Sequence, residues 1–144
     1  MSSLGVVLCT LLAAASVLLT RLRLRGAQVA GRTRTGRPVL TVHTVAGLTA
    51  LVLWVALLVL GATLLDVVGE DVASLLGILA LAAWWVTAGA GLLVLARWLP
   101  TRGKRAAAAA ADGWSAGPGL SLLAHLGTVV CVAVLTWAYA DGRV

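Results

Sequence analysis

The stretch VLTVHTVAGLTALVLWVALLVLGATLL, from Val39 to Leu65, decides the fold, because this long apolar run contains no Asp, Glu, Lys or Arg. A helix of about 17 to 25 such residues is long enough to cross the hydrocarbon layer of a bilayer. Pro38 stands directly before it, and proline suits the first turn of a helix because the N–H that it lacks would be unpaired there. The stretch therefore predicts a transmembrane helix with length to spare for tilt.

Three further apolar runs, at about 4–20, 72–96 and 120–140, have the same character. The chain of 144 residues is 61% hydrophobic and 11% charged, and a water-soluble domain of this size could not bury so much apolar surface. A single strand in lipid would leave its backbone groups unpaired, so each run should be a helix. We predict an all-α fold: one transmembrane domain, residues 1–144, forming an integral membrane four-helix bundle.

The charged residues predict the orientation of this bundle. Ten of the 11 Lys and Arg residues lie in the segments 21–38 and 97–119, whereas Asp66, Glu70 and Asp71 lie between the second and third runs. Basic residues in short loops mark the cytoplasmic side of a membrane protein. We therefore expect two cytoplasmic basic loops and both termini outside. The first run is followed, not preceded, by positive charge, which is typical of a retained helix and not of a cleaved signal peptide.

The net charge of +6 also bears on partners. Basic loops beside membrane spans attract anionic lipid headgroups, so we expect the bilayer itself to be one partner. No aromatic residue interleaves with the first basic segment, as a surface for single-stranded nucleic acid would require, and we predict no nucleic-acid partner. The abundance of Ala, Gly, Val, Leu and Arg is typical of a GC-rich bacterial genome, which predicts a multi-pass protein of the bacterial plasma membrane.

The two halves of the chain share one order: an apolar helix, a basic loop, a proline, and a helix with one His in its first two turns. Two helices per half would make the repeats parallel, related by an axis along the membrane normal. The alternative is an accidental likeness between small hydrophobic helix pairs. In either case His43 and His125 would lie roughly 7 to 10 Å along their helices from the cytoplasmic end, at similar depth.

His43 and His125 are the only histidines of the chain. An ionisable group within a membrane span normally faces the bundle interior and marks a functional site. Zinc and copper sites usually take three or four protein ligands, whereas haem needs only two, because the porphyrin supplies the other four nitrogens. The pair therefore predicts haem b with His43 and His125 as metal ligands. The alternative is that each His only hydrogen-bonds to a neighbouring helix or points toward the headgroups.

Helical spacing predicts which residues surround the ligand on the second helix. Gly47, Ala50 and Trp54 follow His43 at intervals of four, three and four residues, and so share its face. We expect the small side chains of Gly47 and Ala50 to leave room for the cofactor beside His43. Trp54 would line the flat face of the ring.

The fourth helix and the basic loops predict the polar contacts of the same cofactor. Ser121 and Thr128 share a face with His125, and their hydroxyls are suited to orient an imidazole N–H or to meet the propionates. Arg37 and Arg97 lie at the same end of the bundle. We expect these two guanidinium groups to pair with the haem propionates.

The segment His43-Thr44-Val45-Ala46-Gly47, with His on alternate helices of a four-span chain, resembles the small membrane b-type cytochromes of respiratory and cytochrome b561-like systems. The resemblance implies haem b and single-electron transfer near the cytoplasmic face. Those families commonly carry two haems and more histidines, whereas this chain has one pair. Electron transfer across the whole bilayer would then need a partner protein with further cofactors.

The alternative function is a cofactor-free accessory subunit of a larger membrane complex, such as a respiratory one, or a homo-oligomer. Small residues at packing spacing, including Ala83, Thr87 and Gly91, would provide the contact faces. The acids lie in the connections, away from either His, so no hydrolytic triad is indicated, and we expect an electron-transfer or accessory subunit and not an enzyme. Cys9 and Cys131 are expected to be buried apolar residues without a disulfide.

Overall fold

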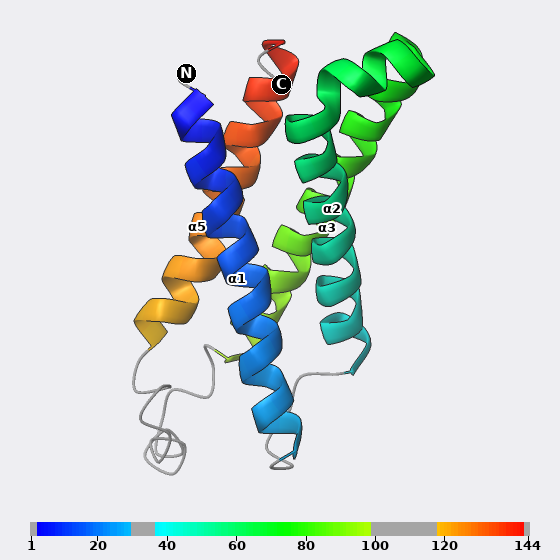
Figure 1. The fold of residues 1–144 in the computed structure, drawn as a ribbon. Coiled ribbons are helices and arrows are strands. Elements are labelled where there is room, and N and C mark those ends of the chain that lie inside the picture. The colour runs from blue at the N-terminus through cyan, green and yellow to red at the C-terminus, as the bar shows by residue number, and fades with distance from the viewer. Residues whose placement is uncertain (1–2, 30–36, 99–117, 143–144) are drawn as a thin grey trace, which may run out of the picture.

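The computed structural model describes residues 3–29, 37–98 and 118–142, which form four α-helices. They are α1 (Ser3–Val29), α2 (Arg37–Val68), α3 (Glu70–Trp98) and α5 (Pro118–Ala140). The helices alternate in direction, with α1 and α3 running one way and α2 and α5 the other, and the two chain ends lie at the same end of the molecule (Figure 1). The prediction of an all-α fold with four helices is confirmed.

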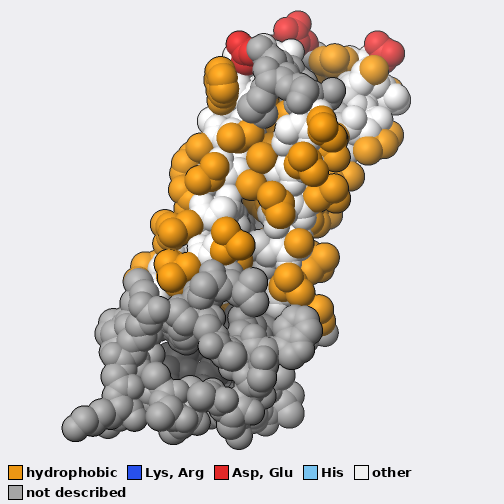
Figure 2. Space-filling view, turned by 90° about the vertical axis from the view of Figure 1, so that its left-hand side faces the viewer, with side chains coloured by type: hydrophobic (Ala, Val, Ile, Leu, Met, Phe, Trp, Pro, Cys, Tyr) orange, Lys and Arg blue, Asp and Glu red, His pale blue; other side chains and the backbone are white. Residues whose placement is uncertain are grey.

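The surface of the described residues is that of a membrane protein. The segments Pro38–Val68, Glu70–Ala96 and Leu122–Ala140 are long and apolar enough to cross a membrane, whereas the apolar part of α1, Leu4–Thr20, is shorter. Hydrophobic side chains cover the flank, and acidic side chains gather at one end (Figure 2). An apolar surface of this extent would be exposed to water in a soluble protein. The fourth crossing, by α1, stays a prediction.

The helix ends differ from the apolar runs that predicted them. α1 continues through the arginines that follow Thr20 as far as Val29, so the expected loop 21–38 is helical over its first part. Arg, Leu, Ala and Gln all favour a helix, and the backbone can therefore stay helical after the side chains become polar. α2 likewise begins at Arg37 and ends at Val68, beyond both ends of its run.

The connection between α2 and α3 is the single residue Gly69, within the short acidic segment that separates the second and third apolar runs. Its φ of 80° is in the left-handed region that favours glycine. The Gly69 N–H donates to the carbonyl of Leu65, and its carbonyl accepts from the N–H of Ala73, both at 3.1 Å. One glycine therefore ends α2 and begins α3, and the two helices form a tight hairpin.

The four helices form a ring in the order α1, α2, α3, α5. The most extensive packing is between α2 and α3; α5 packs on both α1 and α3, and α1 has a smaller contact with α2. Consequently α2 and α5, the two helices that carry histidine, lie diagonally across the bundle. Side chains on their inward faces can meet only in the core.

The core is built around two tryptophans, Trp54 and Trp84, whose side chains are fully buried. Trp54 on α2 also forms a polar contact with α1: its Nε1–H donates to Thr10 Oγ1 at 3.1 Å, and the Thr10 hydroxyl donates to the carbonyl of Val6 at 2.9 Å. The contact joins α1 to α2, where the two helices otherwise touch little.

We expect Trp54→Phe to destabilise the bundle, because it keeps an aromatic ring but removes the N–H donated to Thr10. Interhelical hydrogen bonds in membrane proteins contribute about 0.6 kcal/mol on average, and a loss of that order beyond the loss in a matched control is expected in the free energy of unfolding measured in detergent. Trp84→Phe is the matched control, because Trp84 is also fully buried but its Nε1–H has no hydrogen-bond partner among the described residues. An equal loss in both variants would show that the buried hydrogen bond adds nothing.

Gly77 on α3 lies against the ring of Tyr139 on α5, so closely that a Cβ at this position would overlap the ring. The Tyr139 hydroxyl donates to the Ser74 carbonyl at 2.8 Å and lies 3.3 Å from the Ser74 hydroxyl. The ring is thus held between a glycine and a hydrogen bond. This contact fastens α5 to α3 at the acidic end of the molecule.

Gly77→Ala is accordingly expected to displace Tyr139 and to lower the free energy of unfolding in detergent by about 1 to 3 kcal/mol, as overpacking usually does. Gly61→Ala is the control, because a Cβ there meets no atom within 4 Å. Alanine at Gly61 should slightly stabilise α2, since it favours a helix more than glycine does. If both variants change stability in the same direction, the packing of Tyr139 on Gly77 is not important.

Candidate functional site

The two histidines meet in the core of the bundle. His43, in the second turn of α2, is 4% exposed, and His125, on α5, is 5% exposed. Their ring centroids are 6.2 Å apart and the ring planes are nearly perpendicular, at 86°. Two residues far apart in the sequence thus converge from diagonally opposite helices.

A glycine of the third helix completes this arrangement. A Cβ placed on Gly91 of α3 would lie 2.9 Å from His125 Nδ1 and 3.6 Å from His43 Nε2. One nitrogen of each imidazole therefore borders the same point of the α3 backbone, and any larger side chain would displace the rings. From its spacing alone, Gly91 was predicted only to be a packing residue. Gly91 lies seven residues before the last residue of α3, and His125 lies seven residues after Pro118, the first residue of α5. These equal counts were the signal in the sequence that could have placed Gly91 at the depth of His125.

The residues expected beside His43 are buried on its face, but they do not form a space for a cofactor. A Cβ on Gly47 would lie 2.8 Å from Val17 Cγ2 and 3.3 Å from Thr87 Cγ2. Gly47 therefore lets α1 and α3 approach α2 and does not leave room beside the ligand. Ala50 and Trp54 are fully buried but lie about 10 and 16 Å further along the helix, so they belong to the core and not to the imidazole pair.

On α5, the Thr128 hydroxyl donates to the carbonyl of Ala124 at 2.7 Å and lies 3.1 Å from the hydroxyl of Ser16 on α1. Ser16 in turn donates to the same carbonyl at 3.4 Å. The Thr128 hydroxyl was predicted to orient an imidazole N–H, but these hydrogen bonds do not involve an imidazole. They instead hold the turn of α5 that carries His125 against α1, because Ala124 directly precedes His125 in the chain.

Three predicted site residues lie on the helices but have side chains outside the described part of the chain: Arg37, Ser121 and Arg97. Their predicted contacts with propionates or with an imidazole N–H therefore stay predictions. The described site consists of His43, His125 and Gly91, together with the hydroxyls that hold α5 to α1.

The donor set limits which metal the site can hold. Within the described residues no group of three or more His, Cys, Asp or Glu side chains could bind a metal ion. Zinc sites normally need at least three protein ligands, and two imidazoles alone do not provide them. A metal that brings its own equatorial ligands requires only an axial pair, and iron in a porphyrin is such a metal.

A cleft of about 410 Å³ lies at the acidic end of the bundle and is distinct from this site. Gly61, on its wall, is about 27 Å along α2 from His43. The cleft is lined by Leu57, Gly61, Leu65, Glu70, Ala73, Ser74, Tyr139 and Ala140.

No family model, no curated protein and no solved structure matches the chain.

Proposed function

We propose that this chain is an integral membrane b-type haem protein, or the haem-bearing subunit of a larger complex, with His43 and His125 as the axial ligands. The observation that carries the proposal is the convergence of the two buried imidazoles at 6.2 Å from diagonally opposite helices. A pair that only satisfied separate hydrogen bonds would not need to meet at one point in the core.

The pair offers the donors that haem takes from a protein. The rings lie edge to face with centroids 6.2 Å apart, and each would offer one imidazole nitrogen to a porphyrin iron, whose other four nitrogens come from the porphyrin. Because Val17 and Thr87 fill the space at Gly47, the helices would have to separate to admit the ring. When held by two imidazoles, haem would supply a one-electron couple.

The protein's own residues would position this couple and keep water from it. The hydrogen bonds among Ser16, Ala124 and Thr128 hold the turn before His125, and the absence of a side chain at Gly91 admits both ring nitrogens to the same place. The apolar core beyond the pair excludes water. Fixed ligands and a dry site are the means by which a protein controls a redox cofactor.

The placement in the membrane forms part of the proposal. The ends of α2 and α5 near the histidines lead into the Arg-rich segments, so we place this end at the cytoplasmic face of a bacterial plasma membrane, against anionic headgroups. α1 crosses with the other three helices, and both termini lie outside. Haem near one face cannot carry electrons across the bilayer alone, so the electron donor or acceptor is a membrane partner with further cofactors.

The test is a reduced-minus-oxidised absorption spectrum of the full chain, expressed with sufficient haem and purified in mild detergent. We expect the sharp bands of a low-spin b-type haem and, after extraction as the pyridine complex, about one haem b per chain. A purified protein without haem bands contradicts the proposal. A haem-free chain that co-purifies with a larger complex would favour the accessory-subunit alternative.

A further inference from the structure

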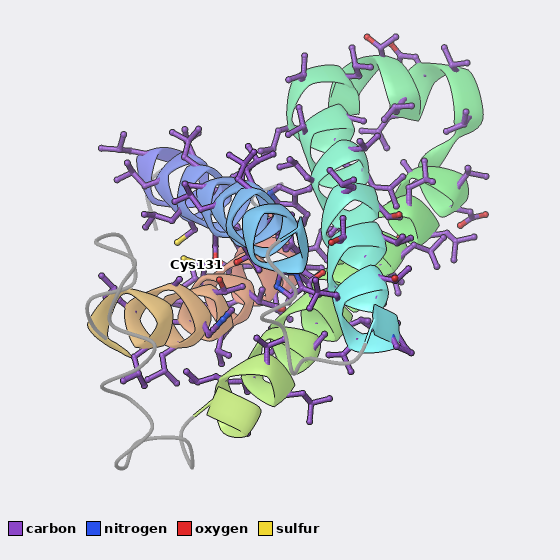
Figure 3. All side chains as sticks on the ribbon, turned by 90° about the horizontal axis from the view of Figure 1, so that it is seen from below. Cys131 is labelled. Carbon is purple, nitrogen blue, oxygen red and sulfur yellow. The ribbon has the colours of Figure 1, made fainter. Side chains whose placement is uncertain are left out.

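Cys9 on α1 and Cys131 on α5 are in contact, although they are on the first and the last helix. Both cysteines are free, Cys131 is buried and Cys9 is half-buried, and the two thiols are near neighbours. Figure 3 shows Cys131 on the side of α5 that faces α1. The imidazole site does not use these thiols, and the sequence predicted only two buried apolar residues without a disulfide.

A second contact between the same helices has the same register. Ser16 on α1 donates to the carbonyl of Ala124 on α5, and Cys9 is seven residues before Ser16 while Cys131 is seven residues after Ala124. The helices run in opposite directions (Figure 1), so both steps are about 10 Å toward the same end of the bundle. Two contacts two turns apart therefore agree on how α1 and α5 are aligned, and both would be lost if either helix rotated or slipped.

We propose that Cys9 and Cys131 form a dithiol–disulfide couple that links α1 to α5, oxidised by a lipid-soluble quinone. The sulfur–sulfur bond forms as each thiol gives up one hydrogen, and the two electrons and two protons pass to the quinone, which becomes the quinol. A quinone is the appropriate class of oxidant because Cys9 is reached from the apolar flank of α1, between exposed leucines at positions 8 and 12. A water-soluble oxidant would have to enter hydrocarbon to reach it.

The disulfide would join the helix with the shortest apolar segment to a helix that carries a proposed ligand. The loop that it closes contains nearly the whole chain, and a long closed loop is the case in which a cross-link restricts the unfolded chain most. In the oxidised form α1 could not leave the bundle while α5 stays in place. The couple is thus a covalent lock on the α1–α5 pair, independent of whether haem is bound.

The test uses the full chain in detergent micelles, reduced and then incubated with decylubiquinone. We expect the intact mass to fall by two hydrogens. Both thiols should lose their reactivity with N-ethylmaleimide added after unfolding in sodium dodecyl sulfate, so that burial does not mask them, and a phosphine reductant should restore both the mass and the reactivity. Cys9→Ser and Cys131→Ser, with helical content checked by circular dichroism, should each keep one reactive thiol and form no link within the chain. Two reactive thiols in the wild-type chain after quinone treatment would overturn the proposal.

The matched control moves one thiol by about one turn. Cys9→Ser with Leu12→Cys keeps two cysteines, but position 12 is 62% exposed on the outer side of α1. This variant should remain reduced under the same conditions, because its thiols face different directions. Oxidation of the control as fast as the wild type would also overturn the proposal. All these measurements report only the oxidation state of the two thiols. A negative result would therefore not contradict the haem proposal, and a protein without haem would not contradict the proposal of a dithiol–disulfide couple.

Discussion

Replacing His43 and His125 together by alanine is expected to yield a protein that folds but carries no haem. Each imidazole provides half of the protein's donor set, and His43 and His125 are the only histidines of the chain. Each single variant should lose haem at least about tenfold, because the loss of even a supporting residue beside a metal often costs that much affinity. The measurement is the ratio of haem to protein after purification, with circular dichroism to confirm that the helices remain.

The controls for this prediction lie on the same helices and face outward. Val45 is two residues after His43 on α2, Leu126 directly follows His125 on α5, and both side chains are exposed. Val45→Ala and Leu126→Ala should keep the haem content of the wild type. Haem retained in full by the double histidine variant would place the cofactor elsewhere, and haem lost equally in the controls would show that the assay reports general instability.

The second large effect is expected from Gly91→Ala. The new Cβ would lie 2.9 Å from His125 Nδ1, well inside the ordinary contact distance of about 3.5 to 4.0 Å, so the ring must move or α3 must retreat. Either shift would change the distance and the angle between the two imidazoles, on which binding of one iron by both rings depends. We expect haem content to fall about tenfold, with a loss of stability of roughly 1 to 3 kcal/mol from overpacking. Haem-to-protein ratio and unfolding in detergent measure the two effects separately.

Gly89→Ala is the control for Gly91→Ala. It makes the same chemical change two residues earlier on α3, where a Cβ would meet no atom within 4 Å. Haem content should match that of the wild type, and stability should rise slightly because alanine favours a helix. If the two variants bind haem equally well, Gly91 has no special place beside the imidazoles.

The sequence predicted the helices well and their ends less well. An uncharged apolar run in lipid has no alternative to a helix, so Val39 to Leu65 had to form one, and the same argument applied to the other three runs. That argument does not apply to the charged residues that flank each apolar run. α1 continues to Val29 because its arginines and leucines still favour a helix. Gly69 alone joins α2 to α3 because a left-handed residue can reverse the chain in one step.

The candidate site, too, could be predicted only in part. The equal depth of His43 and His125 followed from counting residues after Pro38 and Pro118, since depth along a helix is proportional to residue number, and their inward facing followed from the rule that ionisable groups within a span face the bundle interior. The places of Gly91 and of Cys9 also depend on how α3 and α1 are rotated about their axes. Periodicity sets that rotation only where one face is more polar than the other, and both helices are apolar or small on nearly every side.

The order of the helices around the ring has a consequence for biosynthesis. α1 is the first helix to be made, yet its main packing partner is α5, the last. Chains emerge from the ribosome at about 5 to 20 residues per second, so α1 waits several seconds for its neighbour, while the α2–α3 hairpin can close as soon as both of its helices have been made. During that interval the inner face of α1 is open to chaperones, to lipid or to another nascent chain.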